Sequence, residues 1–107
     1  MTFQAPRETR SSRLLLGAQT IVFPGKSFRR EVRSIYVESP VAGPVQIFLD
    51  TLAPSGLVGG NPIGNRNTFV PVSKLLVPAG HQLLIRWPNA MAVGNVSTCA
   101  LECDGEL

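Results

Sequence analysis

Apolar and polar residues alternate in short stretches along much of the chain, which predicts half-buried β-strands. The alternation is clearest in residues 44–50 and 81–87 and is also present in residues 31–38. The residues that share the apolar face of these three stretches are Val45, Ile47 and Leu49, then Leu83, Ile85 and Trp87, and finally Arg33, Ile35 and Val37.

Three further stretches complete a pattern of about six strands. Residues 14–23 are apolar and β-rich in their second half, and residues 95–102 close the pattern. Residues 69–77 are apolar and β-branched, but Pro71 favours an edge or irregular strand there, because proline cannot donate to a ladder. Turn signals separate the strands, at Pro24-Gly25, Pro78-Ala79-Gly80 and Gly94-Asn95.

The spacing of strands and turns predicts an all-β fold, an antiparallel β-sandwich of either the jelly-roll or the Ig-like type. The chain has 107 residues, of which 44% are hydrophobic and 19 are Gly or Pro, so it suits one small domain, which we expect over residues 14–107. No stretch approaches the roughly 18 consecutive apolar residues of a membrane span, and the polar N-terminus does not resemble a signal peptide.

Residues 51–68 contain four Gly, two Pro and three Asn, which predicts one long loop. Loops of this length in a compact domain are unusual and often functional. The loop also carries Leu57, Val58 and Ile63, apolar residues that a solvated loop does not need. Two interpretations stay open: a crossover or solvated excursion, or a contact loop that inserts into a partner together with Arg66.

The charge is uneven along the chain. Residues 1–33 hold seven basic and two acidic residues, whereas residues 34–107 hold three basic and five acidic ones. We expect residues 1–13 to form an extended basic arm whose removal would abolish association and leave the β fold intact. The alternative is an ordinary frayed terminus. The arginines of the predicted patch are Arg7, Arg10 and Arg13 of the arm, with Arg29 and Arg30 after the first turn.

The partner of such a patch is expected to be an acidic protein surface. Nucleic acid is unlikely as a partner, because aromatic residues do not interleave with the arginines and no nucleic-acid-binding motif is present.

Candidate chemistry is sparse, and we predict that the chain is not an enzyme. His81 could be joined to Asp50 and a serine in a triad, but no nucleophile-elbow motif supports this. Cys99 and Cys103 would lie about 13 Å apart in a continuous strand, too far for a disulfide, and are expected to be reduced. We expect no metal and no cofactor, because no ligand motif is present.

The stretches Ser34–Asp50 (SIYVESPVAGPVQIFLD) and Val77–Trp87 (VPAGHQLLIRW), together with the basic arm and the long loop, give the chain a general resemblance to small β-sandwich structural proteins of tailed bacteriophage virions, of the capsid decoration or accessory type. The resemblance implies a non-enzymatic subunit that binds and stabilises a capsid or tail lattice. Its partners would be the major capsid protein or other virion proteins and further copies of itself, for example in a homotrimer. Its location would be the virion, after synthesis in the host cytoplasm.

An alternative function is a carbohydrate- or receptor-binding module of a phage fibre. This interpretation requires Trp87 or Tyr36 to be exposed on a sheet face, whereas a core position for Trp87 would argue against it.

Overall fold

The computed structural model describes residues 2–13, 19–39, 44–61, 66–88 and 96–106, and the structural statements below concern these residues. Almost all regular structure in these ranges is β, apart from one short 3-10 helix, η1 (Pro54–Gly56). The strands are β1 (Thr2–Gln4), β2 (Glu8–Arg13), β3 (Gln19–Phe23), β4 (Arg29–Glu38), β5 (Val45–Leu49), β6 (Leu57–Asn61), β7 (Arg66–Phe69), β8 (Leu76–Val77), β9 (Leu83–Trp87) and β10 (Val96–Glu106). No described helix has the length and apolar character needed to cross a membrane.

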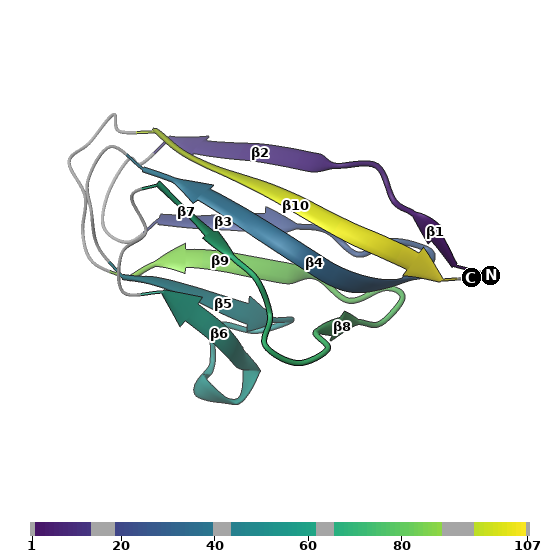
Figure 1. Ribbon diagram of the computed structural model, residues 1–107. Coiled ribbons are helices and arrows are strands. Elements are labelled where there is room, and N and C mark those ends of the chain that lie inside the picture. The colour runs from purple at the N-terminus through teal and green to yellow at the C-terminus, as the bar shows by residue number, and fades with distance from the viewer. Residues whose placement is uncertain (1, 14–18, 40–43, 62–65, 89–95, 107) are drawn as a thin grey trace.

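Two antiparallel sheets pack face to face (Figure 1). The larger sheet has the order β2-β10-β4-β7, with β1 continuing beside β10 and β8 beside β4. The smaller sheet has the order β3-β9-β5-β6. These two interleaved orders of four strands are those of a double Greek-key jelly roll. The predicted all-β sandwich is therefore confirmed, and the strand order selects the jelly roll over the Ig-like arrangement.

The core lies between the sheets and follows the predicted alternation at most positions, although Leu49 is half-buried and Phe48 and Leu84 of the opposite faces are buried. Ile47 and Val45 of β5 are buried, as are the apolar residues of β9, including Trp87 at 1% exposure. The buried cluster also contains Ile21, Phe23, Val32, Ile35, Val37, Val77, Cys99, Leu101 and Cys103. Side chains of alternate residues on both sheets thus supply the hydrophobic free energy of the fold.

The predicted orientation of the Arg33 side chain is wrong, because β4 contains a β-bulge at this residue. In the register of β4 with β10, Ser34 pairs with Glu102 and Val32 pairs with Cys103, so that Arg33 is an additional residue. An extra residue changes the phase of the alternation. As a result Arg33 is exposed instead of sharing the inner face with Ile35.

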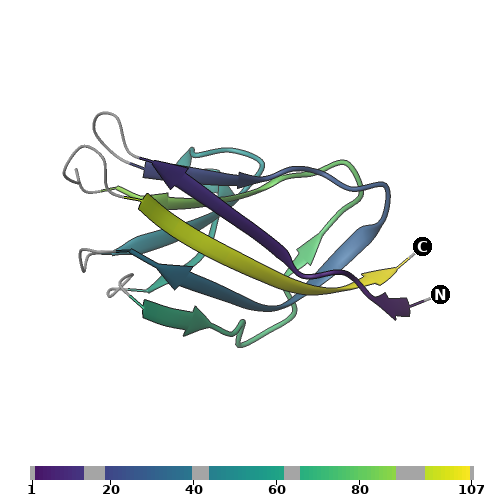
Figure 2. The ribbon, with the colours of Figure 1, turned by 90° about the horizontal axis from the view of Figure 1, so that it is seen from above.

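The prediction of an extended N-terminal arm is wrong, because residues 2–4 and 8–13 form strands of the larger sheet. β1 and β2 both pair with β10, as Figure 2 shows at the edge of the sandwich. Between them Ala5 is buried, and its N–H donates to the carbonyl of Cys103 at 3.1 Å. The ring of Phe3 lies over Gly105, where a side chain would collide with it, and packs edge-on against Phe28. The domain therefore includes the segment that the charge pattern had separated from it.

The prediction of one long loop over residues 51–68 is also wrong for the residues that the structure describes. It contains η1, then β6, which pairs with β5, and the start of β7, which pairs with β4. The glycines that suggested a loop have a packing role in β6: a Cβ on Gly59 would lie 2.8 Å from Cζ of Phe69. Glycine here lets an aromatic ring of the other sheet approach the backbone closely.

Candidate interaction site

An apolar groove of about 490 Å³ lies where the outer strands of the two sheets, β6 and β7, come together. β6 supplies one wall, and β7 with the irregular segment 70–75 supplies the other. We call this the groove side of the sandwich. Its lining is Val58, Gly59, Gly60, Phe69, Pro71, Val72, Ser73, Lys74 and Leu75.

Exposed apolar side chains gather in the same part of the chain. Of the eight large hydrophobic residues that are exposed in the described ranges, six come from residues 52–58 and 70–76. Val72 is fully exposed and Val70 largely so. Single exposed apolar residues are ordinary, but neighbouring ones at a groove, here Val58 and Val72, are typical of a protein–protein contact. The six are Leu52, Leu57, Val58, Val70, Val72 and Leu76.

β6 and β7 are also edge strands. Among the described residues, β6 pairs with β5 alone and β7 with β4 alone. An edge strand presents unpaired N–H and C=O groups, and proteins usually guard such edges with charges or proline. β6 has neither within Leu57–Asn61. The groove side can therefore accept an extended segment of a partner by backbone pairing as well as by apolar contact.

Charged residues form the rim of this side. Lys74 lies 3.9 Å from Glu31, and Arg66 of β7 lies 3.6 Å from Glu38, with both basic side chains mostly exposed. An apolar centre with a polar rim is the usual anatomy of an interface. Of the predicted contact residues in 51–68, Val58 lines the groove, Leu57 and Arg66 are exposed on β6 and β7 outside its lining, and Ile63 lies outside the described residues.

The basic residues of the N-terminal third are mostly paired within the chain. β10 carries the acidic C-terminal residues antiparallel to β4 and beside β1 and β2, which brings opposite charges together. Arg29 lies 2.7 Å from Glu106 and holds the pKa of that carboxyl below its ordinary value. The other pairs are Arg7 with Glu102 at 3.8 Å, and Arg33 with Asp104 at 3.2 Å and with Glu102 at 4.0 Å.

Arg30 does not belong to an accessible basic patch, contrary to the prediction. It is only 1% exposed, because it occupies an inward position of β4. Its guanidinium donates to Glu8 at 3.1 Å and to the carbonyls of Pro24 and His81 at 3.2 and 3.1 Å. Arg30 therefore joins β2, β4 and two turns at one end of the sandwich. Arg13 is in β2, and its side chain lies outside the described part of the structure.

His81 and Asp50 are in contact, as the triad hypothesis required. Nδ1 of His81 bonds Oδ2 of Asp50, and the bond lowers the pKa of Asp50 below its ordinary value of 3.8. However, the carboxylate also accepts the N–H of Gln82 at 3.1 Å, and the Gln82 amide donates to the Asp50 carbonyl at 3.1 Å. Asp50 has a φ of +65° at the start of the connection that follows β5, and these bonds tie it to the connection between β8 and β9. The arrangement serves the fold at an exposed position.

Cys99 and Cys103 are both free and buried in β10. Burial raises the pKa of Cys99 to about 12 and that of Cys103 to about 11, which is typical of inert structural thiols. The described residues contain no group of three or more His, Cys, Asp or Glu that could hold a metal ion.

Half of the groove was not identified from the sequence. The sequence pattern predicts a strand that includes Phe69, Val72 and Leu75, and only Pro71 indicates an irregular stretch. The sequence does contain an indication of the groove: this proline occurs among apolar residues at both odd and even positions. An irregular segment cannot bury all of them.

Comparison with known proteins gives no family for this chain. No family model and no curated protein matches it. Among solved structures, that of PirA is similar over 91% of this chain and 92% of its own, with 14% identity and a TM-score of 0.39. Hydroquinone 1,2-dioxygenase from Sphingomonas sp. TTNP3, solved with 4-hydroxybenzoate bound, is similar over 89% and 63%, with 15% identity and a TM-score of 0.19. Both scores are too low to carry an argument, so the chain is defined by its own strand order and surface as a jelly-roll β-sandwich with an apolar edge groove.

Proposed function

We propose that this chain is a non-enzymatic structural subunit that binds a protein lattice through the groove side, as a decoration or accessory protein of a virion. The observation that carries the proposal is the apolar groove between the edge strands β6 and β7, of which β6 carries neither charge nor proline. Repetition of the subunit over a lattice would make a modest affinity per copy sufficient.

The contact would combine two elements. A partner segment in extended conformation adds to the edge of β6, and its side chains enter the groove beside Val58 and Val72. Lys74 and Arg66 at the rim contribute orientation and rate of association more than affinity. The virion is the lattice indicated by the resemblance of Ser34–Asp50 and Val77–Trp87 to phage structural proteins.

Carbohydrate binding by a fibre module is less well supported. It required an exposed aromatic platform, and Trp87 is buried in the core. Tyr36 is half-buried, and its hydroxyl donates to Glu38 at 3.3 Å. A single partly covered ring offers little stacking surface.

The test is to purify particles from the source that encodes the chain and to measure its copy number by quantitative mass spectrometry. We expect many copies per particle in the wild type and a loss of at least tenfold for Val58→Asp combined with Val72→Asp. Absence of the wild-type chain from purified particles would refute the virion role.

A matched control separates association from folding. Val22 of β3 has the same exposure as Val58, 41% against 40%, but lies on the outer strand of the other side of the sandwich. Val22→Asp should leave the copy number unchanged. Equal losses for Val22→Asp and for the groove variant would show that the groove is not the contact.

A further inference from the structure

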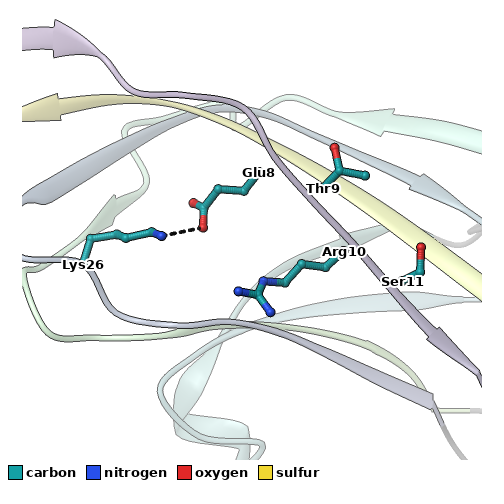
Figure 3. A pocket seen from close by; sticks show the side chains of 5 residues that line it. All are labelled: Glu8, Thr9, Arg10, Ser11 and Lys26. Atoms are coloured by element: carbon teal, nitrogen blue, oxygen red, sulfur yellow. Dashed lines mark ion pairs between the residues drawn. The ribbon is translucent and has the colours of Figure 1, made fainter.

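A second surface lies on the opposite side of the sandwich from the groove. There β2, an outer strand of the larger sheet, packs beside β3 of the smaller sheet. A pocket of about 500 Å³ is bordered by four consecutive residues of β2 and by Lys26 of the β3–β4 connection (Figure 3). We call this the arginine side. The lining is Glu8, Thr9, Arg10, Ser11 and Lys26.

The side chains of Glu8 and Arg10 leave the same side of β2 and extend toward the segment of Lys26, as Figure 3 shows. Thr9 and Ser11 point the other way, as the alternation of a strand requires, and the hydroxyl of Ser11 bonds that of Thr98 at 2.9 Å. The pocket is therefore faced by the cationic groups of Arg10 and Lys26 and by the carboxylate of Glu8.

Both oxygens of the Glu8 carboxylate, the one acidic group that lines this pocket, already have cationic partners. Oε2 of Glu8 accepts from the buried Arg30 at 3.1 Å, and Oε1 lies 3.3 Å from the ammonium of Lys26. Arg10 forms no ion pair with any carboxylate in the part of the chain that the structure describes. Arg10, Lys26 and the buried Arg30 thus surround Glu8, and these four side chains together carry a net charge of +2, although Arg30 lies behind Glu8 and does not line the pocket.

We infer that this pocket binds a dianionic oxyanion group, a phosphate or a sulfate. A guanidinium presents planar paired donors that match such a group, and an ammonium supplies a second point charge. In the part of the chain that the structure describes, β2 pairs with β10 alone, so alternate N–H groups on its outer edge add further donors. A dianion balances the local excess, whereas a carboxylate or a phosphodiester, each with one charge, balances half of it. This inference concerns a different surface from the groove and does not depend on the proposed function.

The test is an NMR titration of the full-length, ¹⁵N-labelled chain at pH 7.5 and constant ionic strength. The probes are sulfate, phenyl phosphate, acetate and a short thymidine oligonucleotide without terminal phosphates. We expect saturating shifts of the amides of Glu8–Ser11 and Lys26 with sulfate and phenyl phosphate only. No saturating shift with either dianion, or equally tight binding of acetate or of the oligonucleotide per phosphate, would overturn the inference.

Arg10→Gln should weaken binding of both dianions by about tenfold, the effect of one charge-assisted hydrogen bond. Arg7→Gln is the matched control, because Arg7 is also exposed and near β2 but lies outside the pocket and faces Glu102. It should change affinity by less than twofold. Equal weakening by the two variants would show unspecific attraction to the basic surface and would contradict a site.

Discussion

The two open sides of this sandwich are built from the same kind of element and differ in chemistry. Each side consists of one outer strand from each sheet, β6 with β7 on the groove side and β2 with β3 on the arginine side. The groove side gathers apolar residues around Phe69 and carries its charges only at the rim. The arginine side gathers charge around one carboxylate and buries one of its cations completely. The same edge geometry therefore gives an apolar contact on one side and an ionic one on the other.

The difference has an energetic consequence. Apolar side chains on the groove side are exposed in the free chain, so a partner that buries them gains hydrophobic free energy of binding. The central charges of the arginine side are already committed to the fold through Glu8 and Arg30. Substitutions should consequently affect stability most on the arginine side and association most on the groove side.

Removal of residues 1–13 is expected to have the largest effect. It deletes β1 and β2, uncovers the outer edge of β10 along most of its length, and leaves Arg30 without its carboxylate. We expect loss of cooperative unfolding in circular dichroism melts. A truncated chain with a wild-type melting curve would show that these strands are dispensable, as the sequence pattern had suggested.

Glu8→Ala should destabilise the chain by about 3–5 kcal/mol, because it leaves a buried guanidinium unpaired. Urea unfolding measures the change. The double variant Glu8→Ala with Arg30→Met removes both charges and should recover much of the loss. If the double variant is less stable than Glu8→Ala, the pair is not the reason for the destabilisation.

Phe69→Ala tests the groove side and should cost about 2 kcal/mol, less than a fully buried phenylalanine, because the ring is only half-buried. It packs against Gly59 and thereby joins the two sheets. Val72→Ala, in the same groove but fully exposed, should change stability by less than about 0.5 kcal/mol. Similar losses for the two variants in urea unfolding would contradict this assignment.

Acid should weaken the bonds that Asp50 forms with His81 and Gln82. The pKa of Asp50 is lower in the folded chain than its ordinary value of 3.8, because of the bond from His81. Its contribution to stability is therefore present above about pH 4 and is lost as the pH falls through the lowered pKa. Asp50→Asn should flatten the decline in unfolding free energy between pH 5 and pH 2. A decline identical to that of the wild type would exclude Asp50 as a source.

We expect the smallest change in the free energy of unfolding when one exposed valine on either side is replaced by aspartate. Val58→Asp and Val22→Asp each place a carboxylate at an exposed position and should both lie within about 0.5 kcal/mol of the wild type in urea unfolding. A large loss for Val58→Asp alone would mean that this residue serves the fold.

The strands of the core were predictable because their alternation is local. Residues 44–50 and 81–87 show the period of two directly, and the residues predicted on their apolar faces are buried except Leu49, which is half-buried. Phe48 and Leu84, predicted on the opposite faces, are buried as well. The bulge at Arg33 was not predictable, since it depends on the register of β4 against β10, which follows β4 in sequence by more than 50 residues. The pairing of β1 and β2 with the C-terminal strand is likewise a long-range choice, and charge composition alone made the segment look separable.

Residues of the two candidate sites were likewise predictable only where the indication lies in the local sequence. Leu57 and Val58 were identified as contact residues because apolar residues in a glycine-rich stretch need an explanation. The opposite wall of the groove at Val58 comes from β7 and residues 70–75 and became visible only in the structure. Arg30 was misassigned because nothing in its neighbourhood in sequence indicates that Glu8 and two turn carbonyls enclose it.

The claim that the groove side makes the contact with a lattice is tested most directly by amide hydrogen exchange of the full chain, free and bound to purified particles. We predict protection on binding at Leu57–Asn61 and in residues 70–75, with little change at Glu8–Ser11. Protection confined to β2 and Lys26, or no protection in β6, would contradict the account.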